Sequence, residues 1–170
     1  MQTALDILLT VSFWAAALRI ATPLIFASLG EIFAERAGVL NIGLEGMMLM
    51  GAFTGFAAAF ASGSVPLGLL AGIAGGMAIG LVFAIFTVTV KANQIVVGAA
   101  INLLGMGLTA FLFRTFYVST GIGVEIAQPI AIPYLSDLPV VGPAIFRQNA
   151  IVYATIPAVI LAWVVLFRTS

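Results

Sequence analysis

The sequence has very few charged residues and lacks both cysteine and histidine. Charged residues make up 7% of its 170 residues, six basic and six acidic, whereas soluble domains carry about 25%. A surface in contact with water cannot be built from so few charges, which excludes a soluble globular domain. Without cysteine or histidine, these residues form no disulfide, no thiolate site and no ordinary zinc site. The formal net charge of zero gives no indication of a nucleic-acid partner.

Long hydrophobic runs take the place of the missing charges. Hydrophobic residues make up 63% of the chain, and a helix needs about 20 apolar residues to cross a bilayer core about 30 Å thick. Uncharged stretches of sufficient length are residues 46–90, which can form two helices, residues 92–113 and residues 148–167. We therefore predict an all-α, polytopic transmembrane helical bundle of about five membrane-crossing units, which forms a single domain over residues 1–170.

Proline, serine and charge indicate where these spans begin and end. The sequence SGSVP at residues 62–66 divides the longest run, because serine caps helices and proline fits a first turn. Pro23 lies in the middle of residues 4–33, which predict either one long tilted helix or one span followed by a half-helix. The first 21 residues lack a basic n-region and contain Asp6, so we expect them to belong to the mature chain rather than to a signal peptide.

The few basic residues indicate an orientation in the membrane. Arg36, Lys91 and Arg168 would lie on one side, and Arg114 and Arg147 on the other. The positive-inside rule then places the first group in the cytoplasm and the N-terminus outside.

Residues 114–148 form the long connection that this orientation places outside. Prolines at positions 129, 133, 139 and 143 exclude a continuous helix there. We expect this outer loop to be either a structured connector or a docking surface for an outside partner.

A third of the charges lie close together between two hydrophobic stretches, where glycine and asparagine also interrupt the apolar pattern. These charges are Glu31, Glu35, Arg36 and Glu45. A charge at membrane depth costs about 2.5–3.5 kcal/mol on insertion scales, so such residues tend to be paired or to line water. On a helix, Asn41 and Glu45 would share a face, and a polar face of this kind suits a water-lined passage. With Gly43 between them, they are our candidates for a substrate pathway. The alternative is that Glu45 forms a structural ion pair with Arg19 or Arg36.

Glycines recur at intervals of four residues in the next run. The row consists of Gly68, Gly72, Gly76 and Gly80, and Ser64 and Ala84 extend it. Helices in lipid associate through close contact between small residues, so this row predicts tight helix packing rather than a binding site.

A further polar group begins the span that follows Lys91. Asn93 and Gln94 mark its start, and Asn102 lies eight residues beyond Gln94 on the same face, with Gly98 between them. A buried amide of this kind either bonds a neighbouring helix or lies on the substrate pathway. We include Asn102 as a candidate for the pathway. The sequence contains no catalytic triad, metal cluster, phosphate loop or paired acid, so we expect neither an enzyme nor a metal site.

Three stretches resemble the permease subunits of ABC importers in the branched-chain amino acid, simple sugar and nucleoside group. They are ATPLIFASLGEIFAERAGVLNIGLEGMMLMGAF, KANQIVVGAAINLLGMGLTAFLFR and the loop PIAIPYLSDLPVVGPAIF, which is similar to the nucleoside-type members. The run ERAGVLNIGLEGMM is the most specific part, and the resemblance covers nearly the whole chain. It implies a discontinuous second helix, with residues 41–45 beside the central pathway.

The resemblance also implies the partners of such a subunit. These are a second permease subunit, a cytoplasmic ATP-binding subunit, an extracytoplasmic substrate-binding protein and the lipid bilayer of the bacterial inner membrane. The permease would bind no cofactor directly, because the partner ATPase uses the ATP. We therefore expect a non-enzymatic, multi-pass subunit that imports nucleosides or related simple sugars.

The end of the chain departs from the family pattern. Family members continue into a cytoplasmic coupling segment and several more helices, whereas this sequence ends at FRTS. We therefore expect the N-terminal part of a permease. Two alternatives remain open, a truncated membrane relic that does not transport and an ion-coupled secondary transporter.

Overall fold

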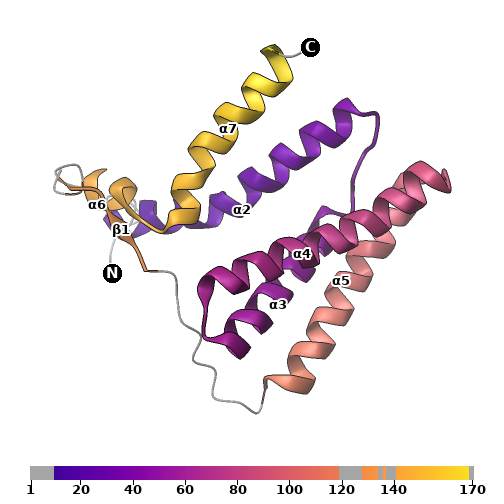
Figure 1. The fold of residues 1–170 in the computed structure, drawn as a ribbon, viewed down its shortest axis with the longest axis horizontal. Coiled ribbons are helices and arrows are strands. Elements are labelled where there is room, and N and C mark those ends of the chain that lie inside the picture. Colours follow the sequence, from indigo (N-terminus) through magenta and orange to yellow (C-terminus); the bar gives the residue numbers. More distant parts are fainter. Residues whose placement is uncertain (1–9, 119–127, 134–135, 137–140, 169–170) are drawn as a thin grey trace, which may run out of the picture. The chain divides into compact units, whose positions relative to one another are not determined.

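The structure, a computed structural model, describes residues 10–118, 128–133, 136 and 141–168. Five helices in this part are long and apolar enough to cross a membrane (Figure 1). They are α2 (Val11–Arg36), α3 (Leu44–Ser62), α4 (Val65–Ala84), α5 (Gln94–Phe116) and α7 (Ala150–Arg168). A π-helical turn, η1 (Ile85–Thr89), continues α4. The predicted all-α bundle with about five crossing units is confirmed.

The helix ends follow the glycine and proline signals. Gly63 adopts a left-handed conformation, with φ of 62°, and its N–H donates to the Ala59 carbonyl oxygen, which ends α3. Pro66 lies in the first turn of α4, and Ser64 occupies the N-cap position. The predicted break at residues 62–66 is therefore confirmed, although the Ser64 side chain makes no capping hydrogen bond.

Pro23 lies inside α2, which continues through it as one helix. A transmembrane helix tolerates proline where nearby groups replace the lost hydrogen bond. The alternative of a half-helix that begins at Pro23 is therefore wrong, and the interruption lies further on. Residues 37–43 connect α2 to α3, and the two helices are separate candidate spans. We call this irregular connection the break; a discontinuous second helix, which the resemblance implies, stays a prediction.

The chain divides into two compact units, one of which comprises residues 34–126. In this unit α3 packs against both α4 and α5. It runs antiparallel to α4 and parallel to α5, as the partners at its two ends show. Gly55 and Gly51 approach Gly68 and Gly72 in reverse order. Towards the end of α3, a cluster of rings joins α3 to α5, with the Phe56 and Tyr117 centroids 5.0 Å apart.

The other unit comprises residues 1–33 and 127–170. Its short strands β1 (Ile130–Ala131) and β2 (Arg147–Gln148) pair antiparallel, and α6 (Val141–Phe146) directly precedes β2. The Tyr153 hydroxyl donates to the Ile130 carbonyl oxygen at 3.0 Å. These elements occupy part of the predicted outer loop, whose first residues, up to Phe116, belong to α5. Residues 119–127, 134–135 and 137–140 of that loop, and Asp6, lie outside the described residues.

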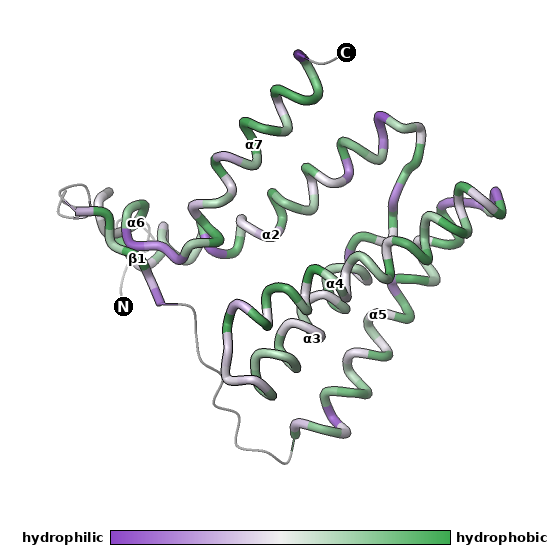
Figure 2. The backbone as a smooth tube through the Cα atoms, viewed as in Figure 1, coloured by the Kyte–Doolittle hydropathy of each residue, from purple (hydrophilic) through white to green (hydrophobic). Residues whose placement is uncertain are grey.

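The helices expose apolar rather than polar side chains. Hydrophobic residues run along most of each helix, and polar residues gather near helix ends and connections (Figure 2). Leu103 is 72% exposed and Met77 is 69% exposed. A helix that exposes such residues along its length is suited to lipid or to other helices rather than to water. The chain is a multi-pass membrane protein.

Candidate solute pathway

The break between α2 and α3 begins with a glycine-based helix end. Gly38 has φ of 81°, a left-handed conformation that glycine adopts without steric cost. The Gly38 N–H donates to the Glu35 carbonyl oxygen and the Val39 N–H donates to the Ala34 carbonyl oxygen, both at 2.9 Å. This pair of bonds is the Schellman motif, which satisfies the last carbonyl groups of a helix.

Asn41 lies in the break and outside either helix. Its Oδ1 accepts the Gly43 N–H at 3.0 Å, and its Nδ2 donates to the sulfur of Met47 at 3.4 Å. The predicted helical face shared by Asn41 and Glu45 is therefore wrong, because α3 begins only at Leu44, after the N-cap Gly43.

Glu45 lies in the first turn of α3 and is exposed. A carboxylate there interacts favourably with the positive end of the helix dipole. With the described residues of its own unit, residues 34–126, its side chain forms no ion pair or hydrogen bond. The alternative of a structural ion pair with Arg36 is therefore not found, and the alternative with Arg19 stays open because Arg19 belongs to the other unit.

The start of α3 lies directly against α5. A Cβ atom on Gly105 would lie 2.6 Å from the Gly46 Cα, and a Cβ atom on Gly98 would lie 2.8 Å from the Gly43 nitrogen. Only glycine allows backbones to approach so closely. At this contact Asn102 reaches across from α5, and its Oδ1 accepts the Gly46 N–H at 2.7 Å.

The glycine row of α4 lies against α3 over part of its length. A Cβ atom on Gly68 would lie 2.7 Å from the Ala59 Cβ, and one on Gly72 would lie 3.0 Å from the Gly51 carbonyl oxygen. Gly76 and Gly80 face α3 more loosely, since a Cβ atom there would meet Met47 atoms at 3.7 and 3.8 Å.

The α3 side of this contact was not predicted from the sequence. It is a second row at the same interval of four residues, made of Met47, Gly51, Gly55 and Ala59. The regular interval could have revealed it.

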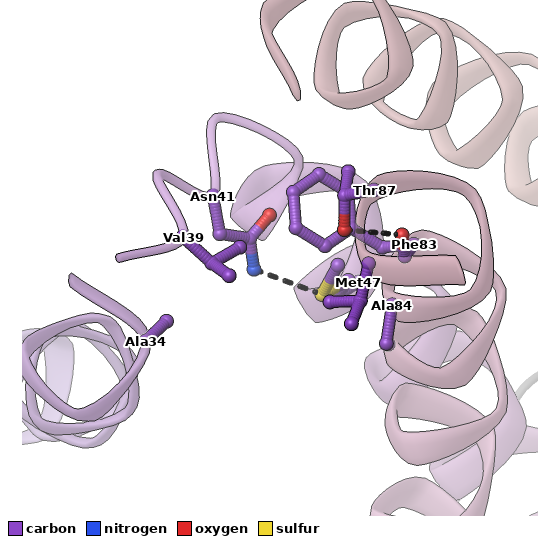
Figure 3. Close-up of a pocket in the computed structure, with 9 residues that line it drawn as sticks. Ala34, Val39, Asn41, Met47, Phe83, Ala84 and Thr87 are labelled. Carbon is purple, nitrogen blue, oxygen red and sulfur yellow. Dashed lines mark hydrogen bonds between the residues drawn. The ribbon is translucent and has the colours of Figure 1, made fainter. Parts of the chain in front are cut away.

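A pocket of about 260 Å³ lies beside the break, within the unit of residues 34–126. The end of α2, the break, the start of α3, the end of α4 and η1 all contribute to its walls (Figure 3). Its only polar side chains are Asn41 and Thr87. The Thr87 hydroxyl donates to the Phe83 carbonyl oxygen at 2.8 Å, so it faces its own helix.

Of the predicted pathway residues, Asn41 lines this pocket, whereas Gly43, Glu45 and Asn102 do not. Phe83 and Thr87 were not predicted from the sequence, because nothing in the apolar run 81–90 distinguishes a π-helical turn from an ordinary α-helix. π-Helical turns are frequent at functional sites.

The lining of the pocket is uncharged. Within the described ranges, no three histidine, cysteine or acidic residues gather into a possible metal site. The lining therefore offers no charged side chain to a bound group, and the Asn41 amide already bonds Gly43 and Met47.

The fold and this site together define a helical membrane protein with an irregular connection between two helices beside a small pocket. Residues 13–170 match the family described as "Branched-chain amino acid transport system / permease component". The chain belongs to this family. No solved structure matches it.

Three curated relatives show how much of a family member the chain represents. It is 43% identical over 157 residues to the putative glucose ABC transporter permease protein TsgC13 of Haloferax volcanii, covering 91% of this chain and 47% of that protein. It is 39% identical over 166 residues to the guanosine ABC transporter permease protein NupQ of Bacillus subtilis, covering 91% and 51%. It is 38% identical over 159 residues to the nucleoside ABC transporter permease protein NupC of Lactococcus lactis subsp. cremoris, covering 88% and 50%. The chain spans about half the length of these relatives.

Proposed function

We propose that this chain forms part of the permease of an ATP-driven importer for nucleosides or related simple sugars. The observation that carries the proposal is the family match over residues 13–170. The names of the three relatives, one for glucose and two for nucleosides, give the range of solutes to test. The uncharged pocket agrees with neutral solutes of this kind.

The proposed transporter needs partners that this chain does not supply. A cytoplasmic ATP-binding subunit would hydrolyse ATP, a second permease subunit would complete the passage, and an extracytoplasmic binding protein would deliver the solute. The permease itself would be a non-enzymatic subunit that binds no cofactor, located in the bacterial inner membrane.

We place the passage along the break at residues 37–43 and the start of α3. Asn41 lines the pocket there, Gly43 allows the break to lie close to α5, and Glu45 is exposed one turn further on. Asn102 lies at the same contact and bonds the backbone of the break.

Uptake by cells tests the transport activity. Deletion of the gene should lower uptake of labelled guanosine, uridine or glucose, and expression of the complete gene should restore it. Uptake that survives loss of the ATP-binding subunit but stops when an ionophore removes the ion gradient would instead indicate a secondary transporter. Unchanged uptake of every nucleoside and sugar would contradict the proposal.

The pathway is tested at Glu45. We expect Glu45→Gln to lower uptake while membrane insertion stays intact, because the substitution removes an exposed charge from the passage with little change in shape. The control is Glu35→Gln, the same change at an exposed residue in the last turn of α2. Should Glu45→Gln instead prevent assembly, and a charge exchange with Arg19 restore it, the structural ion pair would be the better explanation.

A further inference from the structure

The backbone of the break is held by two amide side chains of α5. Gln94 Oε1 accepts the Leu40 N–H at 2.7 Å. Eight residues further along α5, Asn102 uses both of its polar atoms. Its Oδ1 accepts the Gly46 N–H at 2.7 Å, and its Nδ2 donates to the Ile42 carbonyl oxygen at 2.9 Å.

The hydrogen bond from the Gly46 N–H to Asn102 replaces the capping hydrogen bond that α3 lacks. Leu44 is the first residue of α3, so Gly46 is the third, and the N–H at this position is normally accepted by the N-cap side chain. The N-cap here is Gly43, which has no side chain and makes no side-chain cap. Asn102 therefore supplies, from another helix, the acceptor that a local cap would provide.

The surrounding glycines make this arrangement possible. Gly98 lies between Gln94 and Asn102, and a Cβ atom on it would lie 3.1 Å from the Ile42 carbonyl carbon. A larger residue at Gly98 would hold the break away from α5 and out of reach of both amides. Gln94, Gly98 and Asn102 are four residues apart, which places them on one face of α5.

We propose that Gln94 and Asn102 are positioning residues that fasten the break and the first turn of α3 to α5, so that these three segments move together. Asn102 then affects the passage by fixing the backbone on which Asn41 and Glu45 are placed, rather than by touching the solute. The attachment to α5 is inferred from the hydrogen bonds alone, whereas its effect on transport depends on the proposed function.

Hydrogen exchange measures the attachment directly, without any transport. The full chain is placed in lipid nanodiscs, and exchange at single amides in residues 40–46 is followed by mass spectrometry. Asn102→Leu should raise exchange at Gly46 about tenfold, because the amide loses its acceptor. Asn102→Asp keeps that acceptor, so Gly46 should stay protected. Gln94→Leu should raise exchange at Leu40 while leaving Gly46 protected.

Asn149→Leu is the matched control. Asn149 caps α7, and its Oδ1 accepts the Val152 N–H at 3.0 Å. The same substitution there should raise exchange at Val152 and leave residues 40–46 unchanged. Unchanged exchange at Gly46 in folded Asn102→Leu would overturn the proposal, as would equal exchange in the Leu and Asp variants. If the Leu variant does not fold, Asn102→Asp and Gln94→Leu decide: unprotected Gly46 in the former or unchanged Leu40 in the latter overturns it.

Guanosine uptake separates positioning from direct contact. Asn102→Asp keeps the acceptor for Gly46 but loses the donor to the Ile42 carbonyl oxygen. A positioning role therefore predicts that this variant lowers the maximal rate and leaves competition by uridine and glucose unchanged. An altered order of competition would show that Asn102 contacts the solute, and would overturn the positioning role. If the unmodified protein takes up no guanosine, uridine or glucose, the proposed function fails, while the exchange result still decides whether Asn102 fastens the break.

Discussion

The two faces of α3 pack against their neighbours in different ways. Towards α4, small residues on both helices follow a regular interval of four, from Gly51 and Gly55 to Gly68 and Gly72. Towards α5, the glycines are irregularly spaced. This contact also contains the two hydrogen bonds of the Asn102 side chain and a cluster of aromatic rings.

This difference follows from the backbone groups at each contact. In the middle of α3 and α4, the backbone groups bond within their own helix, so close packing alone is sufficient to hold the two helices together. The first N–H groups of α3 have no partner within their own helix, and the segment before them is irregular. In a membrane such groups need partners from neighbouring protein. The α5 face supplies those partners. Three predictions test the contrast.

The largest effect is expected at the contact with α5. Gly105→Ala would place a Cβ atom 2.6 Å from the Gly46 Cα and 2.7 Å from its carbonyl oxygen, and backbone atoms cannot move aside as a side chain can. We expect the free energy of unfolding in bicelles to fall by about 3 kcal/mol, at the upper end for overpacking. Gly107→Ala is the matched control on the same helix, because nothing lies within 4 Å of its Cβ position. Equal losses in both variants would show that helix α5 is sensitive to alanine everywhere.

An intermediate and graded effect is expected along the α4 row. Gly68→Ala would place a Cβ atom 2.8 Å from the Gly55 carbonyl oxygen, so we expect a loss of about 2 kcal/mol. Gly80→Ala meets only the Met47 sulfur at 3.8 Å, and should be neutral or stabilising by up to about 1 kcal/mol through helix propensity. The same unfolding measurement ranks the two. A uniform cost along the row would contradict the looser contact at its far end.

The smallest effect is expected from the polar bond in the α3–α4 contact. The Thr54 hydroxyl lies 3.1 Å from the Ala71 carbonyl oxygen of α4, but also 2.8 Å from the Met50 carbonyl oxygen of its own helix. Thr54→Val keeps the shape and removes the hydroxyl. We expect a loss of about 0.6 kcal/mol, the average for hydrogen bonds between membrane helices. Ser62→Ala is the control: its hydroxyl donates to the Ala58 carbonyl oxygen of its own helix and accepts the Ser64 N–H in the connection to α4. A loss above that of Gly68→Ala would show that the two contacts of α3 both depend on polar bonds.

The sequence could predict the parts of the site that follow a regular rule. Gly38 ends a helix, and the glycines of the α4 row recur every fourth residue, so their roles can be read along the chain. The position of Asn41 was predicted incorrectly, because a spacing of four residues places two side chains on one face only if both lie in a helix. Its side chain instead bonds the Gly43 N–H, which favours the turn that precedes α3.

The sequence by itself determined that this is a helical membrane protein, that it has about five spans, and where most of these spans begin and end. Length, hydropathy, glycine and proline are sufficient for this, because the bilayer core requires runs of about 20 apolar residues with satisfied backbones. Only the tertiary structure decided that Asn102 caps α3 from another helix and that a π-helical turn forms one wall of the pocket. The physical reason is that Asn102 and Gly46 are 56 residues apart, and a hydrogen bond between them exists only once α3 and α5 lie in contact.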